Sequence, residues 1–317
     1  MISIYYEHPH WFQPLFDELD RRGVTYARVD AGQHRFDPAE PPGNGSRPAL
    51  LFNRMSPSAW KRGHDGAIFY THDYLAHLER EGIALFNGTA SYRFETSKAL
   101  QITLLRQLGL PAPRTRVVNH PACLAAAAEG MTFPLIIKPN IGGSGAGIRR
   151  FDDAGSLAAA AGDPLFEAGL DGTILLQEYH PPRGGSIVRV ETLEHRFLYA
   201  IRVHLGDGAG FDLCPADVCK TTDGRELTSS ACPAGAAKAG LSVEAYEPPP
   251  EIIAAVERIA AAAQIDVGGI EYLVSDRDGQ IYFYDINALS NFVAQPLSVI
   301  GFDPTARLVD ALERRIA

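Results

Sequence analysis

The stretch GGIEYLVSDRDGQIYFYDINALSNF, residues 268–292, predicts a β-hairpin. Two apolar, β-rich runs flank the turn at 277–279, which ends in a glycine suited to the left-handed position of a three-residue hairpin loop. When the pairing is centred on this turn, Glu271 lies directly across from Asp285 on one face of the sheet. Two carboxylates placed opposite each other repel, so we expect a positive charge between them.

The same face of the hairpin carries a third polar residue, Asn287, two positions after Asp285. Oxygen ligands from Glu271, Asp285 and Asn287, with no His or Cys among them, suit a hard cation such as Mg²⁺ or Mn²⁺. The alternative is three polar residues on a solvated sheet face. We expect the metal site because the preceding segments carry matching chemistry.

The composition is that of an ordinary globular protein. Of 317 residues, 46% are hydrophobic and 21% are charged, and the length predicts two or three domains. The formal net charge of −9 argues against a nucleic-acid partner. The N-terminus MISIYYEHPHW lacks the features of a secretory signal, and no apolar run approaches the roughly 18 residues of a membrane span. We therefore expect a cytoplasmic protein without a membrane partner.

The cysteines do not predict a zinc site. None of the four has CxxC spacing, and the pair at 214 and 219 has no second close pair beside it. Reduced thiols are the expectation for Cys123, Cys214, Cys219 and Cys232.

Residues 1–92 alternate short apolar runs with helical patterns. Helices are predicted at 11–22 and 71–80, and strands at 2–6, 24–30, 49–53 and 83–87. This alternation favours a small α/β layer built on a parallel sheet.

The rest of the chain begins with a helix in 96–115, which Thr96 or Ser97 can cap. Strands then dominate, with predicted runs at 114–118, 133–139, 147–151, 173–179, 186–193 and 196–203. Further helices are predicted at 120–128, 154–161, 251–263 and 303–315, and a loop-rich segment at 205–249.

The segment FPLIIKPNIGGSGAGIRRF, residues 133–151, places Lys138 at the end of an apolar strand and then four glycines before another strand. Glycines let backbone N–H groups turn inward and close around phosphate oxygens. The segment is neither a Walker A loop nor a dinucleotide fingerprint, because the spacing and the following strand differ from both. It resembles a movable lid over a triphosphate; the alternative is a flexible hairpin tip with an incidental lysine.

Several other polar residues stand in unusual places. Lys98 lies on the first turn of its helix, where the dipole disfavours a cation, which points to an anionic partner or to a solvated lysine. A buried strand turns polar at Gln177 and Glu178, where it can offer groups to a purine and a sugar. Arg189 and Arg202 lie in apolar strands and should face carboxylates or phosphates.

The order of these segments resembles the ATP-grasp superfamily and, within it, the RimK-like carboxylate–amine ligases. The resemblance spans nearly the whole chain and implies an α/β fold in three parts. It implies a pre-ATP-grasp domain with a small parallel sheet at 1–92, an N-terminal lobe with the glycine flap at 93–180, and a C-terminal lobe with the metal-binding hairpin at 181–317.

The resemblance also implies a role for each matching residue. ATP-binding residues would be Lys98, Lys138, Gly142, Gly143, Ser144, Gly145, Gly147, Gln177, Glu178 and Tyr179. Metal ligands would be Glu271, Asp285 and Asn287, and the catalytic arginines Arg189 and Arg202.

Two positions depart from the family pattern. Ser186 stands where RimK-like sequences usually have Asp, and Asp285 stands where Glu is more usual. Asp217 and Lys220 lie in the loop-rich segment, where substrate-contacting loops occur in the family, and remain candidates without an assigned role.

The function implied is ligation of a carboxylic acid, an amino acid or peptide, to an amine through an acyl phosphate, with release of ADP and phosphate. The substrates would be small molecules or peptides, and a homo-oligomer is compatible with the sequence. The alternative is an ATP-grasp kinase that phosphorylates a small-molecule hydroxyl, since it would share every ATP contact. A third interpretation, a regulatory nucleotide-binding protein without turnover, fits the full set of lysines and metal ligands poorly.

Overall fold

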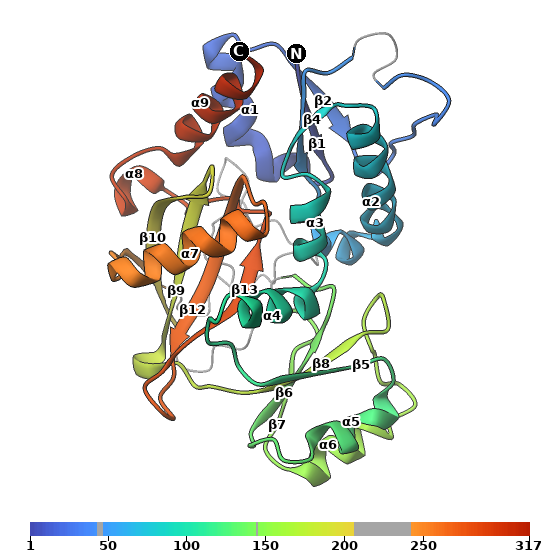
Figure 1. Ribbon diagram of the computed structural model, residues 1–317, viewed down its shortest axis with the longest axis vertical. Coiled ribbons are helices and arrows are strands. Elements are labelled where there is room, and N and C mark those ends of the chain that lie inside the picture. Colours follow the sequence, from blue (N-terminus) through green and yellow to red (C-terminus); the bar gives the residue numbers. More distant parts are fainter. Residues whose placement is uncertain (43–46, 144, 206–241) are drawn as a thin grey trace.

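The computed structural model describes residues 1–42, 47–143, 145–205 and 242–317. Three sheets follow one another along the long axis of the molecule (Figure 1). The N-terminal sheet lies at the top, the sheet with the predicted hairpin in the middle, and the sheet of the glycine segment at the bottom. Within these described ranges, no helix is both long and apolar enough to cross a membrane.

The N-terminal sheet is parallel, as the sequence predicts, with strand order β2-β1-β3-β4. Its strands are β1 (Ile2–Tyr6), β2 (Tyr26–Asp30), β3 (Leu50–Arg54) and β4 (Ala84–Phe86). Its helices are η1 (Pro9–Phe12), α1 (Gln13–Arg22), η2 (Pro57–Arg62) and α2 (Asp65–Arg80). The helix expected at 71–80 begins six residues earlier, at Asp65.

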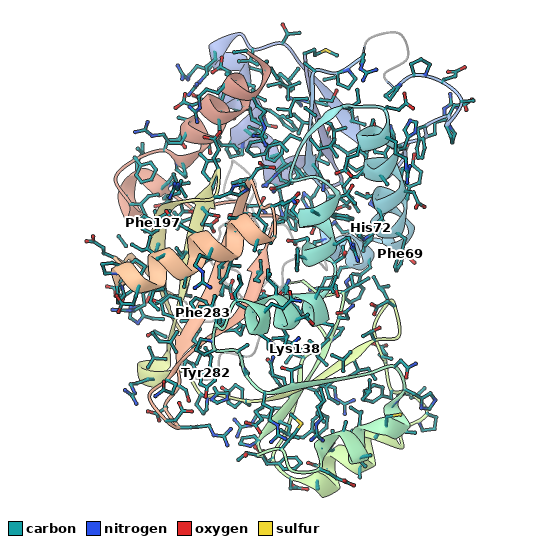
Figure 2. All side chains as sticks on the ribbon, in the orientation of Figure 1. Phe69, His72, Lys138, Phe197, Tyr282 and Phe283 are labelled. Carbon is teal, nitrogen blue, oxygen red and sulfur yellow. The ribbon has the colours of Figure 1, made fainter. Side chains whose placement is uncertain are left out.

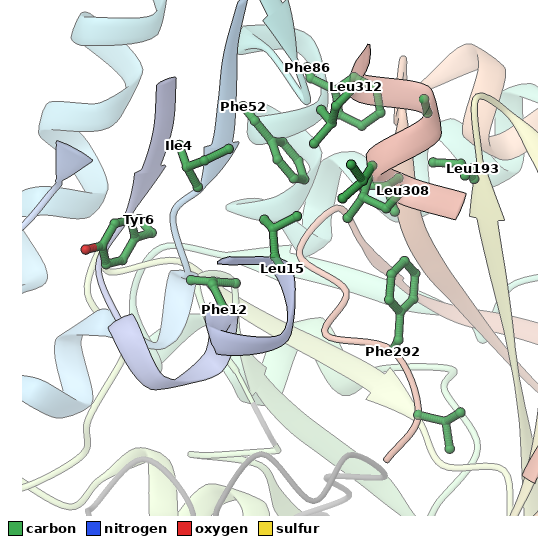
Figure 3. Close-up of a cluster of buried hydrophobic side chains, with 14 of the residues drawn as sticks. Ile4, Tyr6, Phe12, Leu15, Phe52, Phe86, Leu193, Phe292, Leu308 and Leu312 are labelled. Atoms are coloured by element: carbon green, nitrogen blue, oxygen red, sulfur yellow. The ribbon is translucent and has the colours of Figure 1, made fainter. Parts of the chain in front are cut away.

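The last helix of the chain completes the core of the first sheet. Helix α9 (Pro304–Ile316) buries Leu308 and Leu312 in the same cluster as Ile4, Leu15 and Phe52. Figure 3 shows these side chains meeting between the N-terminal sheet, α1 and α9. Burial of each such leucine contributes about 1.5–3 kcal/mol, so this distant helix stabilises the N-terminal layer.

The second sheet, the lowest in Figure 1, is antiparallel with order β5-β8-β6-β7. Its strands are β5 (Thr115–Val118), β6 (Leu135–Pro139), β7 (Arg149–Phe151) and β8 (Ile174–Glu178). The Ala-rich helix expected at 120–128 divides into η3 (Pro121–Cys123) and α5 (Leu124–Ala128), and α6 (Ala154–Ala161) has the expected bounds. Cys123 is an exposed free thiol, whereas Cys214, Cys219 and Cys232 lie outside the described residues.

The third sheet is antiparallel, with order β11-β10-β9-β12-β13. Its strands are β9 (Ser186–Leu193), β10 (Arg196–His204), β11 (Ser242–Ala245), β12 (Val267–Val274) and β13 (Ile281–Asn287). Helices α4 (Lys98–Gln107) and α7 (Pro250–Ala262) pack on one face, and the remaining helices are α3 (Thr89–Glu95), η4 (Arg183–Gly185) and α8 (Pro296–Val299). Ser97 caps α4 as expected, its hydroxyl accepting from the N–H of Leu100 at 3.3 Å. The sequence did not predict α3 or β11.

Asn87 joins the first sheet to the third. It follows β4 in a left-handed conformation (φ 54°) and is 1% exposed. Its side chain donates to the carbonyls of Val267 and Ala288, both at 2.7 Å. Its amide oxygen accepts from the N–H groups of Asp266 and Val267 at 2.8 and 3.2 Å. One side chain therefore satisfies four backbone groups at the start of β12 and the end of β13.

We expect Asn87→Ala to lower the free energy of unfolding by about 3 kcal/mol or more, because it leaves several buried backbone groups without partners. Urea denaturation would measure the loss. Asn119→Ala is the matched control, since Asn119 is exposed, and should change stability by less than about 0.5 kcal/mol. Equal stability of the two variants would contradict the role assigned to Asn87.

Candidate active site

A pocket of about 450 Å³ opens where the three sheets meet. The described residues that line it come from every part of the chain and include Trp11, Ser58, Glu95, Lys98, Lys138, Gly142, Gly143, Gly145, Gln177, Glu178, Tyr179, Arg189, Glu191, Glu271, Asp285, Asn287 and Phe292. Figure 2 shows Lys138, from β6 of the second sheet, just beneath α4. The structure thus gathers most of the residues singled out in the sequence around one cavity.

The hairpin places its two carboxylates as predicted, with Glu271 paired opposite Asp285. The turn differs from the expected three-residue loop. Ser275 and Gln280 form the last hydrogen-bonded pair, with the Ser275 N–H donating to the Gln280 carbonyl at 2.8 Å. The loop between them therefore has four residues, 276–279. A bulge at Tyr284 absorbs the resulting one-residue shift, so the carboxylates still face each other.

Each carboxylate has its own cation. The Lys98 ammonium donates to Asp285, and Arg189 Nη1 donates to Glu271 Oε1 at 3.0 Å. Burial opposes the charged form of Asp285, but Lys98 and Lys138 outweigh it and hold the pKa of this carboxyl below its usual value. Burial prevails at Glu271 and raises its pKa, although Arg189 favours the charged form.

The two lysines differ in how firmly they hold their proton. Burial disfavours the charged form of Lys98, but Asp285 and Glu95 outweigh it and raise the pKa of Lys98. Lys138 is 6% exposed, and within the described ranges it forms no ion pair; its Nζ lies 5.4 Å from the Tyr284 ring centroid. Burial, followed by the charge of Lys98, lowers the pKa of Lys138 to about 8. Lys138 is therefore a buried ammonium ready to accept an anion.

Arg189 lies in the centre of the polar face. Its Nε donates to Glu191 Oε1 at 2.6 Å, while Nη1 reaches Glu271 on the neighbouring strand. The guanidinium lies directly over Gly269. A Cβ at that glycine would come within 2.7 Å of Nε and Nη2 and 2.8 Å of Cζ. The absence of a side chain at 269 is what allows Arg189 to lie between two carboxylates.

The glycine segment borders the pocket through Gly142, Gly143 and Gly145. A Cβ on Gly143 would come within 2.7 Å of Ser58 Cβ, so the flap closely approaches the N-terminal domain. Gly147 has a φ of 76° and packs on Pro139, but it is not among the lining residues. Ser144 lies outside the described residues.

The polar end of β8 also reaches the pocket. Gln177 is 2% exposed and donates to Thr115 Oγ1 at 2.8 Å. Glu178 Oε1 accepts from the N–H of Thr132 at 2.8 Å. Tyr179 follows them on the pocket wall, and its carbonyl accepts from Arg277 Nη1 at 2.9 Å.

Arg202 is not brought to the site. Arg189 pairs with Ile201, and Arg202 pairs with Val188, the next pair along the two strands. Successive residues of a strand point to opposite faces, so Arg202 lies on the face of the sheet opposite Arg189. There it donates to Glu244 Oε1 at 3.2 Å and lies 4.1 Å from the Tyr246 ring centroid. Ser186, which replaces the usual Asp, begins β9 and does not line the pocket. Asp217 and Lys220 lie outside the described residues.

Two acidic residues that the sequence analysis missed line the same pocket. Glu95 accepts from the N–H groups of Ala288 and Leu289, directly after the hairpin. Burial raises the pKa of Glu95 to about 7, although these N–H groups favour its charged form. Glu191 is 1% exposed beside Arg189. Its position two residues after Arg189 in an apolar strand could have predicted its place at the site, because alternate residues of a strand share a face.

The hairpin donors fit a divalent metal. Glu271, Asp285 and Asn287 all offer oxygen atoms to one side of the pocket, and Asn287 Nδ2 lies 3.3 Å from Asp285 Oδ2. Within the described residues, no group of three or more His, Cys, Asp and Glu is arranged to hold a metal. An oxygen-only set of two carboxylates and one amide suits Mg²⁺, which keeps several waters and takes few protein ligands.

We expect Gly269→Ala to displace the Arg189 guanidinium and lower ATP-dependent turnover by about 100-fold, as when one transition-state donor is lost. The clash is with the end of a flexible side chain, so the variant should fold. Gly66→Ala is the matched control, because a Cβ at Gly66 meets nothing within 4 Å, and its turnover should equal that of the parent protein. Full turnover in Gly269→Ala would show that the position of Arg189 is not needed.

The chain matches no protein-family model. A curated D-alanine–D-alanine ligase of Ectopseudomonas mendocina (strain ymp) is 31% identical over 137 residues. This match covers 40% of the present chain and 43% of that enzyme, so the chain spans less than half the length of the curated relative.

Two solved structures cover almost the whole chain. The ATP-grasp ligase PsnB, complexed with a phosphomimetic variant of a minimal precursor, Mg and ADP, has a TM-score of 0.66 at 20% identity over 99% of this chain and 98% of its own. A RimK domain ATP-grasp protein from Sphaerobacter thermophilus DSM 20745 has a TM-score of 0.66 at 17% identity, over 98% of this chain and 99% of its own. The fold expected from the sequence is confirmed: this chain has the ATP-grasp fold.

Proposed function

We propose that this protein is an ATP-dependent ligase that joins the carboxyl group of an amino acid or peptide to an amine. The observation that carries the proposal is that Lys98, Lys138 and the glycine flap border the same pocket as Arg189 and the hairpin carboxylates. Groups suited to a triphosphate and a group suited to an acyl centre therefore face one cavity. The ligases among the similar proteins support the same activity.

ATP would bind between the second sheet (β5–β8) and the third sheet (β9–β13). Lys98, Lys138 and the backbone N–H groups of the flap would hold its phosphates. The end of β8, at Gln177, Glu178 and Tyr179, would contact adenine and ribose. Glu271, Asp285 and Asn287 would hold Mg²⁺, which when bound neutralises and orients the phosphate charge.

The chemistry requires two displacements. In the first, an oxygen of the substrate carboxylate attacks the γ-phosphorus of ATP, the bond to the β–γ bridging oxygen breaks, and ADP leaves with that electron pair. In the second, the amine lone pair adds to the carbonyl carbon of the acyl phosphate. The carbon–oxygen bond to phosphate then breaks, and the amine proton leaves with the phosphate. Arg189 would stabilise the oxyanion of the second step.

The kinase alternative would use the same phosphate contacts but transfer phosphate to a hydroxyl. The similar proteins named above support the ligase instead. We assign the reaction to the cytoplasm, where ATP is available.

We expect hydroxylamine, added with ATP, Mg²⁺ and a panel of amino acids and peptides, to intercept the activated acyl group as a hydroxamate. ADP and phosphate should be released, because in the proposed binding mode the cations of the pocket would surround the terminal phosphate. Iron(III) colorimetry and nucleotide chromatography would measure both products. AMP with pyrophosphate would indicate an adenylate instead, and a stable phosphate ester would support the kinase.

We expect nucleotide affinity to fall as the pH rises through about 8, the pKa of Lys138 in the free protein. Phosphate favours the charged lysine, so binding is strongest below this pKa and weakens by up to about tenfold per pH unit above it. Calorimetry with Mg·AMP-PNP at pH 7 and pH 9 would measure the change. Lys138→Arg is the control, because arginine keeps its charge throughout this range. If the Mg·AMP-PNP affinity of the parent protein changed with pH no more than that of Lys138→Arg, the role of Lys138 would be contradicted.

A further inference from the structure

Glu191 is a buried carboxylate with one unused oxygen. It lies on β9, lines the pocket and is 1% exposed. Its Oε1 accepts from Arg189 Nε at 2.6 Å. Its Oε2 is buried and has no hydrogen-bond partner in the part of the chain that the structure describes. A buried carboxylate oxygen without a donor is destabilising, which points to a donor supplied by a ligand.

Glu191 shares its hydrogen-bonded cation with a second carboxylate. The single charge of Arg189 is shared between Glu191 and Glu271, which leaves the three side chains with a net charge of −1. Lys98 gives its hydrogen bond to Asp285 and acts on Glu271 through its charge alone. Among the described residues, Arg189 is therefore the one cation that hydrogen-bonds to Glu191, and it does so only at Oε1.

Arg54 lies within electrostatic range of Glu191 but gives it no hydrogen bond. Its Nη2 donates to the carbonyl of Ser290 and to Asn291 Oδ1, whereas its Nε and Nη1 are buried without a hydrogen-bond partner in the described part of the chain. Tyr199, the residue opposite Glu191 on β10, accepts from the N–H of Val293 through its hydroxyl. None of the described residues donates a hydrogen bond to Oε2, so a donor from the pocket can take this place.

We propose that Glu191 binds the ammonium group of the substrate whose carboxylate is activated, so that this substrate is an amino acid. The inference rests on the proposed ligase function for the role of the carboxylate. Arg189 would face the carboxylate and Glu191 the ammonium, because the two residues lie on one face of β9 about 7 Å apart along the strand. In an α-amino acid the two groups are separated by one carbon, so both can reach this face together.

The test compares Glu191→Gln with the parent protein. Glutamine keeps the shape and an acceptor for Arg189 but removes the charge. Thermal shift and calorimetry with each of the twenty amino acids and their des-amino acids, in the presence of Mg·AMP-PNP, would measure binding. The parent protein should bind at least one amino acid and reject its des-amino analogue. Glu191→Gln should weaken that binding by about 10- to 100-fold, with AMP-PNP affinity within about twofold of the parent value.

Glu194→Gln is the matched control. It follows β9, pairs with Arg314 outside the pocket, and should bind the amino acid as the parent protein does. Equal amino-acid affinity in Glu191→Gln and the parent protein, or binding of no amino acid by the parent protein, would overturn the proposal. Amino-acid binding that depends on Glu191 without any hydroxamate formation would uphold the ammonium site and contradict the ligase. Hydroxamate formation that is unchanged by Glu191→Gln would support the ligase and contradict the ammonium site.

Discussion

Two buried carboxylates, Glu271 and Asp285, face each other across the hairpin, and the rest of the site is arranged around their repulsion. Lys98 reaches one of them from the start of α4 and Arg189 reaches the other from β9. Because these cations come from different elements, the two carboxylates connect helix α4 to the third sheet. Under the proposed function, polyphosphate and metal would take the place of these internal ion pairs.

This arrangement depends on a connection to the N-terminal domain. Asn87 holds the start of β12 and the end of β13 through four hydrogen bonds, and Glu95 holds the backbone just beyond β13. Helix α9 returns from the other end of the chain to complete the N-terminal core. The pocket is therefore enclosed by three sheets that cannot separate without exposing buried polar groups and apolar side chains.

Much of the site could be predicted from the sequence because alternation along a strand decides which residues share a face. That rule placed Glu271 opposite Asp285. The same rule could not place Arg202. The face on which Arg202 lies depends on the register set by the turn between β9 and β10, and a shift of one residue moves a side chain to the other face of the sheet. The four-residue hairpin loop and the bulge at Tyr284 compensate for each other, so neither was visible in the apolar pattern. The packing of α9 on the first sheet is a long-range contact that no local pattern encodes.

The central claim is that the substrate carboxylate itself attacks ATP in this pocket. Oxygen isotope transfer tests it most directly. An acid substrate labelled with ¹⁸O in both carboxylate oxygens would be incubated with ATP, Mg²⁺ and the amine, and the released phosphate analysed by mass spectrometry. The account predicts one ¹⁸O atom in the phosphate and one in the amide. Phosphate free of label, with amide still formed, would contradict it.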